Sequence, residues 1–175
     1  MKTTFKIING NLYEYDSNGK VIHSKDSNGD EYWYDYDSKG NLIHSKYSSG
    51  DETWREYDSN GNLIHRKSSD GYESWREYDS DGNEIHFKDS DDDEYWREFD
   101  SNGKVIHYKD SSGFEIWSEF DSNGDLTHYK DYNGFENWYD SKGNSITKKE
   151  FDKLKSGCVG KVVEIAGKKY RLTLV

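Results

Sequence analysis

The sequence predicts an all-β protein, an elongated antiparallel array of β-hairpins with a 21-residue period and a small α+β cap at the C-terminus. Two columns of aromatic residues establish the period, because both step by 21 without a slip. Turn signals recur twice in every period, and proline-free strands lie between them. Such self-similarity is typical of a repeat fold, and we expect both columns to form structural ladders. The columns are His23, His44, His65, His86, His107 and His128, and Trp33, Trp54, Trp75, Trp96, Trp117 and Trp138.

Composition favours a thin β structure. Of 175 residues, 31% are hydrophobic and 34% are charged, a balance that can mean disorder. The strict repeat and an aromatic content of 16% argue against disorder. The sequence has no apolar run of 18 residues, no recognisable signal peptide and no partner for a disulfide with its lone Cys158. We therefore expect a cytoplasmic protein with no membrane span.

Charge is distributed unevenly along the chain. The formal net charge is −11, yet residues 147–175 hold eight Lys or Arg against three Asp or Glu, a net charge of +5. Residues 1–146 therefore carry −16. Contacts to phosphate need basic residues, so the array is not expected to bind DNA or RNA directly. A protein partner with a basic surface fits this charge better.

The chain opens on an incomplete unit. Residues 5–9 are predicted to form a first strand, Asn9-Gly10 a hairpin turn and residues 12–16 a second strand. Leu12 stands where later units have Trp. An atypical first unit is expected of a cap that has a neighbour on one side alone.

Two turns alternate along the array. The first has the sequence Asp-Ser-x-Gly, in which Asp accepts backbone hydrogen bonds and Gly takes the left-handed conformation of a bulged hairpin. Lys39 at its third position fits a type I turn and would fit a type I′ turn badly. The second turn is looser, and Asp92 replaces its Gly in the fourth copy. The first turns lie at 16–19, 37–40, 58–61, 79–82, 100–103 and 121–124, and the second at 26–29, 47–50, 68–71, 89–92, 110–113 and 131–134.

The period of 21 residues is odd, so the lengths of the two turns decide which side chains share a face of the sheet. Side chains alternate faces along a strand, so two three-residue loops per unit would flip the faces from one repeat to the next. We therefore expect the turns to differ, with a three-residue bulged loop at the first. The alternative places the histidines on the Trp face and each Lys near the Glu across the second turn, as the recurrent Lys and Glu favour. The preferred faces are Tyr57, Leu63, His65 and Lys67 on one side, and Trp54, Glu56 and Ile64 on the other.

The C-terminal end differs from the array. Thr147-Lys148-Lys149-Glu150 is a capping-box pattern that predicts the start of a helix. Phe151 and Leu154 recur at helical spacing, and Gly157 is placed to end the helix. A hairpin about Ala166-Gly167 is expected to follow. We predict two domains, the β-hairpin array at 1–146 and a cap of helix plus β-hairpin at 147–175.

The recurring Tyr-Asp-Ser-Asn-Gly-Asn-Leu core resembles the YD repeat of RHS-type bacterial proteins, whose core is Tyr-Asp, two variable residues, Gly, one more residue and Leu. Copies at 36–42 and 57–63 match it well, and later copies carry substitutions such as Glu84 for Leu. YD repeats form β-hairpin spirals that can wrap around cargo, but about six units are too few to enclose anything. Single-layer hairpin arrays of the MORN type look similar and act as binding scaffolds. The resemblance implies a scaffold and supplies no catalytic residues.

Metal, cofactor and catalytic sites are not predicted. Equivalent histidines lie two strands apart, on the order of 10 Å, which is too far to share a zinc ion. The acidic turn from Asp89 to Asp93 lacks the flanking helices and the Glu at position 12 of an EF-hand. A catalytic site is one asymmetric constellation, whereas these columns repeat, so we expect no enzyme. Cys158 lies near no His or Asp motif and is expected to be an incidental thiol.

The Trp column has two interpretations. With so few aliphatic residues in the chain, we expect the tryptophans to form the core. If they are exposed instead, they would make a platform on which sugar rings stack. Carbohydrate binding by this aromatic ladder therefore stays an alternative function.

We expect a non-catalytic protein that binds a protein partner along its sheet surface. The runner-up is an acidic inhibitor that imitates nucleic acid and occupies a basic protein, as in phage-type counter-defence. Residues fixed in every unit serve packing, so we look for the binding site where copies differ. These candidate residues are Thr53, Arg55, Arg66, Phe87, Tyr108 and Tyr129.

Overall fold

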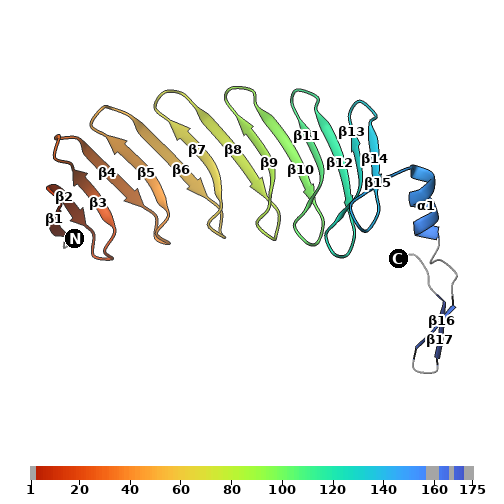
Figure 1. Ribbon diagram of the computed structural model, residues 1–175. Coiled ribbons are helices and arrows are strands. Elements are labelled where there is room, and N and C mark those ends of the chain that lie inside the picture. The colour runs from red at the N-terminus through yellow and green to blue at the C-terminus, as the bar shows by residue number, and fades with distance from the viewer. Residues whose placement is uncertain (1–2, 157–161, 166–167, 172–175) are drawn as a thin grey trace. The chain divides into compact units, whose positions relative to one another are not determined.

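The computed structural model describes residues 3–156, 162–165 and 168–171, and it is mostly β. Fifteen strands follow one another in chain order as antiparallel neighbours in one open sheet, which confirms the predicted fold class (Figure 1). They are β1 Thr4–Ile8, β2 Asn11–Tyr15, β3 Val21–Lys25, β4 Glu31–Tyr36, β5 Leu42–Tyr47, β6 Glu52–Tyr57, β7 Leu63–Ser68, β8 Glu73–Tyr78, β9 Glu84–Asp89, β10 Glu94–Phe99, β11 Val105–Asp110, β12 Glu115–Phe120, β13 Leu126–Asp131, β14 Glu136–Tyr139 and β15 Ser145–Ile146.

The chain divides into two compact units, residues 1–95 and 96–175, and the division falls within β10. Unit one holds β1 to β9, and unit two holds β11 to β15 with the C-terminal elements. The boundary predicted between residues 146 and 147 stays a prediction. Each unit is described by itself below.

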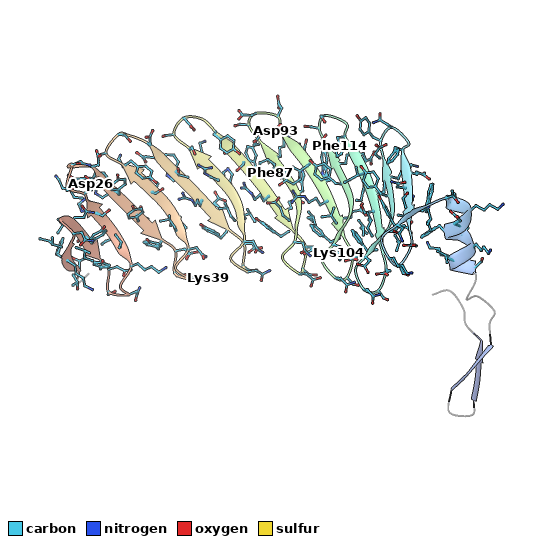
Figure 2. All side chains as sticks on the ribbon, in the orientation of Figure 1. Asp26, Lys39, Phe87, Asp93, Lys104 and Phe114 are labelled. Atoms are coloured by element: carbon cyan, nitrogen blue, oxygen red, sulfur yellow. The ribbon has the colours of Figure 1, made fainter. Side chains whose placement is uncertain are left out.

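Both turns of the repeat are three-residue loops. In the first turn the amide of Asp58 donates to the carbonyl of Asn62 at 3.0 Å, and the amide of Gly61 donates to the carbonyl of Asp58 at 3.2 Å. The second turn, from Asp26 to Gly29, repeats both bonds. In unit one these turns lie at opposite edges of the sheet, as Asp26 and Lys39 show in Figure 2.

Left-handed residues close these turns. Gly61 has a φ of 93°, and Asp92 takes the same region with a φ of 66° where its repeat lacks the glycine. At the N-terminus, Asn9 and Gly10 have φ values of 52° and 85°, which confirms the predicted two-residue hairpin turn.

A β-bulge within the repeat keeps equivalent residues of successive repeats on the same face of the sheet. The expected difference between the two turns is wrong, because both have the same loop length. The register shifts within the strand pair instead: Glu56 faces His65, Tyr57 faces Leu63, and Ile64 has no partner of its own. One extra residue in a strand changes the face of everything beyond it.

The preferred assignment of faces is therefore wrong, and the alternative is confirmed. His65 lies on the Trp face directly opposite Trp75, and Lys67 lies opposite Glu73 across the second turn. The face that we had predicted for Tyr57, Leu63, His65 and Lys67 is split by the bulge. The same register shift occurs between β2 and β3, β4 and β5, β8 and β9, and β12 and β13.

Little of this single sheet is fully buried. Phe151 is the one buried apolar side chain among the described residues. Trp33, Trp54, Trp75 and Trp96 are 38–42% exposed. The expectation that these tryptophans form a core is wrong, because nothing in the described ranges forms a second layer over their face.

One short helix follows the sheet, α1 Lys148–Ser156. The Thr147 amide donates to the Glu150 carboxylate at 2.9 Å, and the Glu150 amide donates to the Thr147 hydroxyl at 3.3 Å, which confirms the capping box. Phe151 is buried and Leu154 is 58% exposed. Within the described part of the chain, no helix has the length and apolar character needed to cross a membrane.

A separate two-stranded sheet lies near the C-terminus, as predicted. β16 (Val162–Ile165) pairs antiparallel with β17 (Lys168–Arg171). Predictions for Gly157 as the end of the helix, for Cys158 and for the Ala166-Gly167 turn lie outside the described residues.

Candidate functional site

One face of the sheet carries the same residue types in every repeat, and we call it the constant face. Each His and the Lys two residues after it lie on this face. So do each Trp and the acidic residues two positions before and after it. In unit one it includes His23, Lys25, Glu31, Trp33, Asp35, His44, Lys46, Glu52, Trp54, Glu56, His65, Lys67, Glu73, Trp75, Glu77, His86, Lys88 and Glu94, and in unit two Glu98, His107, Lys109, Glu115, Trp117, Glu119, His128, Lys130, Glu136 and Trp138.

Each histidine of the constant face lies between two carboxylates, and five of the six stack on an indole of their own unit: His23, His44, His65, His107 and His128. Nε2 of His65 is 2.8 Å from Glu73, and Nδ1 is 3.3 Å from Glu56. The His65 ring stacks on Trp75 with centroids 5.4 Å apart and planes 13° apart. Lys67 Nζ completes the group 3.9 Å from Glu73. The predicted His and Trp ladders are thus one mixed ladder of stacks and ion pairs.

These contacts shift the protonation of both partners. Burial alone would lower the pKa of His107, but hydrogen bonds to Glu115 and Glu98 outweigh it and raise that pKa above 6.5. Lys25 and then His23 lower the pKa of Glu31. When both ring nitrogens face carboxylates, the doubly protonated imidazolium satisfies both contacts.

The opposite face differs from repeat to repeat, and we call it the variable face. Cross-strand pairs show this directly: Tyr34 faces Ser45 in one repeat, whereas Arg55 faces Arg66 in the next. All six candidate residues from the sequence lie on this face of their own unit. In unit one it includes Tyr34, Ser45, Thr53, Arg55, Arg66, Ser74, Arg76 and Phe87, and in unit two Tyr108, Ile116, Ser118 and Tyr129.

The candidates on the variable face make few contacts with one another. Phe87, at mid-strand in β9 (Figure 2), stacks on Tyr95 with centroids 5.1 Å apart. Thr53 is 9% exposed and serves packing rather than contact with a partner. In unit two Tyr108 and Tyr129 lie against aromatic residues of the second turns, Phe114 and Phe135, at 6.1 and 6.5 Å.

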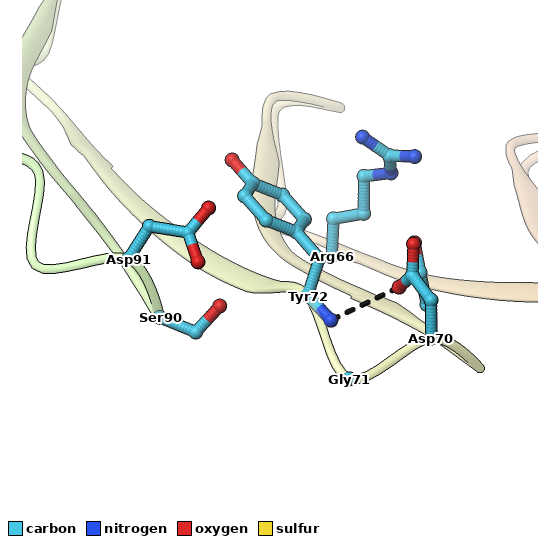
Figure 3. A pocket seen from close by; sticks show the side chains of 7 residues that line it. Arg66, Asp70, Gly71, Tyr72, Ser90 and Asp91 are labelled. Atoms are coloured by element: carbon cyan, nitrogen blue, oxygen red, sulfur yellow. Dashed lines mark hydrogen bonds between the residues drawn. The ribbon is translucent and has the colours of Figure 1, made fainter.

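A shallow hollow opens beside the variable face at the second-turn edge of unit one. It measures about 630 Å³, and Figure 3 shows Arg66 and Tyr72 standing side by side within it, with Asp70 and Asp91 at its margin. The Tyr72 hydroxyl donates to Asp89 at 3.2 Å. The sequence pattern singles out Arg66, and it considers Asp91 only as part of an acidic turn; Asp70 and Tyr72 carry no signal beyond their place in and after a turn.

Potential metal ligands do not gather into a site in the described ranges. No group of three or more His, Cys, Asp or Glu there is arranged to hold a metal ion. His128 differs from the other described histidines, because its buried Nε2 has no hydrogen-bond partner and lies 3.9 Å from Glu136.

Comparison with known proteins bears on the fold. No family model matches the chain, and no curated protein matches it. A chain of the crystal structure of TcdB2-TccC3-Cdc42 aligns with a TM-score of 0.56 and 19% identity over 68% of this protein. A chain of the Photorhabdus luminescens Tc holotoxin pore aligns with a TM-score of 0.42 and 14% identity over 85% of it.

These neighbours are Tc toxin chains, which contain RHS/YD-repeat shells. The first of these alignments supports the fold that the resemblance to YD repeats implies, a long antiparallel β-hairpin array. This chain spans 7% of the first toxin chain and 10% of the second.

Proposed function

We propose that this protein is a non-catalytic scaffold that binds a protein partner through its variable face. The observation that carries the proposal is the separation of repeated and non-repeated side chains onto opposite faces of one sheet. Contacts that recur in every unit stabilise the array, as the stack of His65 on Trp75 does. Side chains that differ between units give a surface without internal symmetry, which recognition of a single partner requires.

The chemistry of the variable face also supports protein recognition. It presents Tyr, Phe and Arg, the residue types enriched at the centres of protein interfaces. Half-buried rings such as Phe87 are already held by neighbours, so little side-chain entropy is lost when a partner covers them.

The geometry of the Trp column does not favour carbohydrate binding. A sugar ring stacks on the flat face of an indole. One face of Trp54 is covered by His44, with centroids 5.2 Å apart, and the neighbouring strand places Lys67 opposite the same indole. The stack therefore leaves at most one face of Trp54 open to a sugar ring.

Acidic mimicry stays the second candidate, because the turns hold fixed negative charge. Hydrogen bonds from the side chain and the amide of Asn62 lower the pKa of Asp58, which keeps this turn carboxylate ionised. Asn83 does the same for Asp79 one repeat later. Rows of such carboxylates along the sheet edges would attract a basic protein.

The test compares one substitution on each face. The partner is captured from the source organism and purified, and its affinity is measured by calorimetry. Phe87→Ser introduces the residue that stands at the equivalent position two repeats earlier, Ser45. It is expected to weaken binding of the partner at least about tenfold. Lys67→Gln on the constant face should leave Kd within about twofold. Binding that is unchanged by Phe87→Ser, is no weaker with Lys67→Gln and weakens steeply with salt would support the acidic inhibitor instead.

A further inference from the structure

Three aromatic residues of unit two form a group where the variable face meets the second-turn edge, and we call them the aromatic corner. They are Tyr108 on β11, Phe114 just before β12 and Tyr132 in the following second turn. The rings of Tyr108 and Phe114 have centroids 6.1 Å apart and planes inclined by 59°, and those of Phe114 and Tyr132 have centroids 5.6 Å apart and planes inclined by 64°. Phe114, at the second-turn edge in Figure 2, is 39% exposed, and Tyr132 is 55% exposed.

The aromatic corner departs from the pattern of the earlier repeats. Each of those repeats has a Ser where Tyr132 stands, and the hydroxyl of one of them, Ser69, accepts a hydrogen bond from the Glu52 amide at 2.9 Å. This bond links neighbouring hairpins. Tyrosine has no oxygen on its Cβ, so Tyr132 cannot make the link in the same way. Phe114 likewise stands where the previous repeat has Asp93. Exposed rings that replace a structural contact and a charged side chain mark a candidate functional site.

Negative charge accompanies these rings. Asp110 accepts hydrogen bonds from the Ser112 hydroxyl at 2.6 Å and from the Tyr108 hydroxyl at 3.4 Å. Hydrogen bonds, that from the Ser112 side chain foremost, lower the pKa of Asp110 and keep its carboxylate ionised. The two second turns of unit two, 110–114 and 131–135, each begin with an Asp and contain no Lys or Arg. Exposed π faces beside a carboxylate attract a cation and repel an anion.

Unit one shows which cation a ring at this position accepts. Tyr72 is the equivalent of Phe114 two repeats earlier, and the Cζ atom of Arg66 lies 5.6 Å from its ring centroid. In unit two, Tyr108 stands where Arg66 stands in unit one, so a third ring replaces the guanidinium. Among the described residues, no Lys or Arg lies over the ring of Phe114 or Tyr132. A guanidinium for these rings therefore has to come from another molecule.

We propose that the aromatic corner binds an arginine side chain of the protein partner, with the guanidinium over the exposed rings and its N–H groups toward Asp110. The proposal rests on the proposed function, a protein partner at the variable face, and names the chemistry of one contact. A guanidinium is planar and weakly hydrated, stacks on aromatic faces and donates charge-assisted hydrogen bonds to a carboxylate. An apolar side chain would gain from the rings alone.

The experiment follows the ring signals of Phe114 and Tyr132 by NMR while the full chain is titrated with acetyl-Gly-Arg-Gly-amide at constant ionic strength. These signals are expected to shift and saturate with a dissociation constant on the order of 10 mM. Citrulline has nearly the shape of arginine without its charge, so acetyl-Gly-citrulline-Gly-amide should bind about fivefold more weakly or worse. The ring of Phe87 is the internal control, because the Cζ atom of Arg76 already lies 4.9 Å from its centroid.

Four outcomes of this titration would overturn the proposal. The first is no shift of Phe114 or Tyr132, and the second is an equal response of Phe87, which would mean general attraction of the basic peptide to an acidic chain. The third is equal binding of the citrulline peptide, which would mean that charge contributes nothing. The fourth is equal binding of acetyl-Gly-Lys-Gly-amide, which would contradict the choice of arginine.

Two variants separate the cation contact from simple apolar docking. Tyr132→Ser restores the residue of the earlier repeats, so it is expected to fold, to melt no lower than the parent and to weaken binding of the Arg peptide. Phe114→Leu keeps an apolar side chain without a π face, and the signal of Tyr132 should then show weaker binding of the same peptide. Arg-peptide binding that is unchanged by Phe114→Leu would contradict a guanidinium stacked on that ring.

The outcome is separable from that of the proposed function. Tyr132→Ser is expected to weaken binding of the captured partner at least about fivefold. If Phe87→Ser weakens partner binding while Tyr132→Ser leaves it unchanged, the arginine contact is wrong and the variable face stands. If neither variant weakens partner binding, the proposed function is wrong, whatever the peptide titration shows.

Discussion

A histidine of the constant face satisfies three neighbours at once. Its two ring nitrogens face carboxylates on the strands to either side, and its ring covers one face of an indole, as His44 does with Asp35, Glu52 and Trp54. Glutamine could replace one of the two hydrogen bonds but not the stack of the ring on the indole. This explains why the same residue type recurs there without a metal ion to bind.

The ion pairs of the ladder make the free energy of unfolding depend on pH, with one limit set by a histidine and the other by two glutamates. The pKa of His107 is raised, so its contribution is complete below its unfolded pKa of 6.5 and is lost as pH rises through the folded value. Lys25 and Lys46 lower the pKa values of Glu31 and Glu52, so these contributions are complete above 4.5 and are lost as pH falls through the folded values.

The thermal midpoint is therefore expected to be highest between about pH 4.5 and 6.5. Differential scanning calorimetry across the acid and alkaline sides measures it. His107→Gln should flatten the alkaline side. A midpoint that keeps rising above pH 8 would contradict the assigned direction of the histidine shift.

The turn at Asp92 offers a test of backbone conformation. A residue with a side chain at a φ of 66° is strained relative to glycine, so Asp92→Gly is expected to raise the free energy of unfolding by about 0.5–1 kcal/mol. Asp91→Gly, at the neighbouring position without positive φ, should lower or leave it. Urea unfolding compares the two, and a destabilised Asp92→Gly would show that its side chain matters more than its backbone.

At the scale of the element, the bulge explains the tyrosine that precedes each Asp-Ser-x-Gly turn in unit one. The hydroxyl of Tyr57 donates to the carbonyl of Leu42, beside the bulge of the previous repeat, at 3.0 Å. Tyr78 does the same for Leu63 at 3.1 Å. The residue thus links one repeat to the one before it, while its ring packs on the variable face.

Removal of that link should have a measurable cost. Tyr57→Phe keeps the ring and loses the bond to Leu42, so the free energy of unfolding is expected to fall by about 1 kcal/mol. Tyr34→Phe, on the same face, is the control, because its hydroxyl has no hydrogen bond among the described residues. Equal effects of the two substitutions would mean that the link contributes nothing.

Local signals in the sequence predicted the elements well. Asp58-Ser59-Asn60-Gly61 specifies its own turn, and Thr147 with Glu150 specifies the start of its helix, since each acts within four residues. The faces were not predictable in the same way. Ile64 forms the bulge, but its sequence, an apolar residue beside Leu63, gives no sign of one. The bulge nevertheless moves His65 to the Trp face.

At the scale of the whole molecule, the solvent exposure of the tryptophans could not be predicted from the sequence. Whether a tryptophan is core depends on whether a second layer covers it, and composition does not say so. Variation between copies is visible in the sequence, and the residues that it singles out lie on the variable face of their own unit. The opposed pair of Arg55 and Arg66 required the register, which follows from the bulge.

The central claim is that the partner contacts the variable face, and photo-cross-linking tests it most directly. A benzophenone amino acid is placed at Phe87 on the variable face or at Trp54 on the constant face, and each variant is irradiated with the captured partner. We predict a covalent adduct with the partner from position 87 and none from position 54. An adduct from position 54 alone would contradict the account.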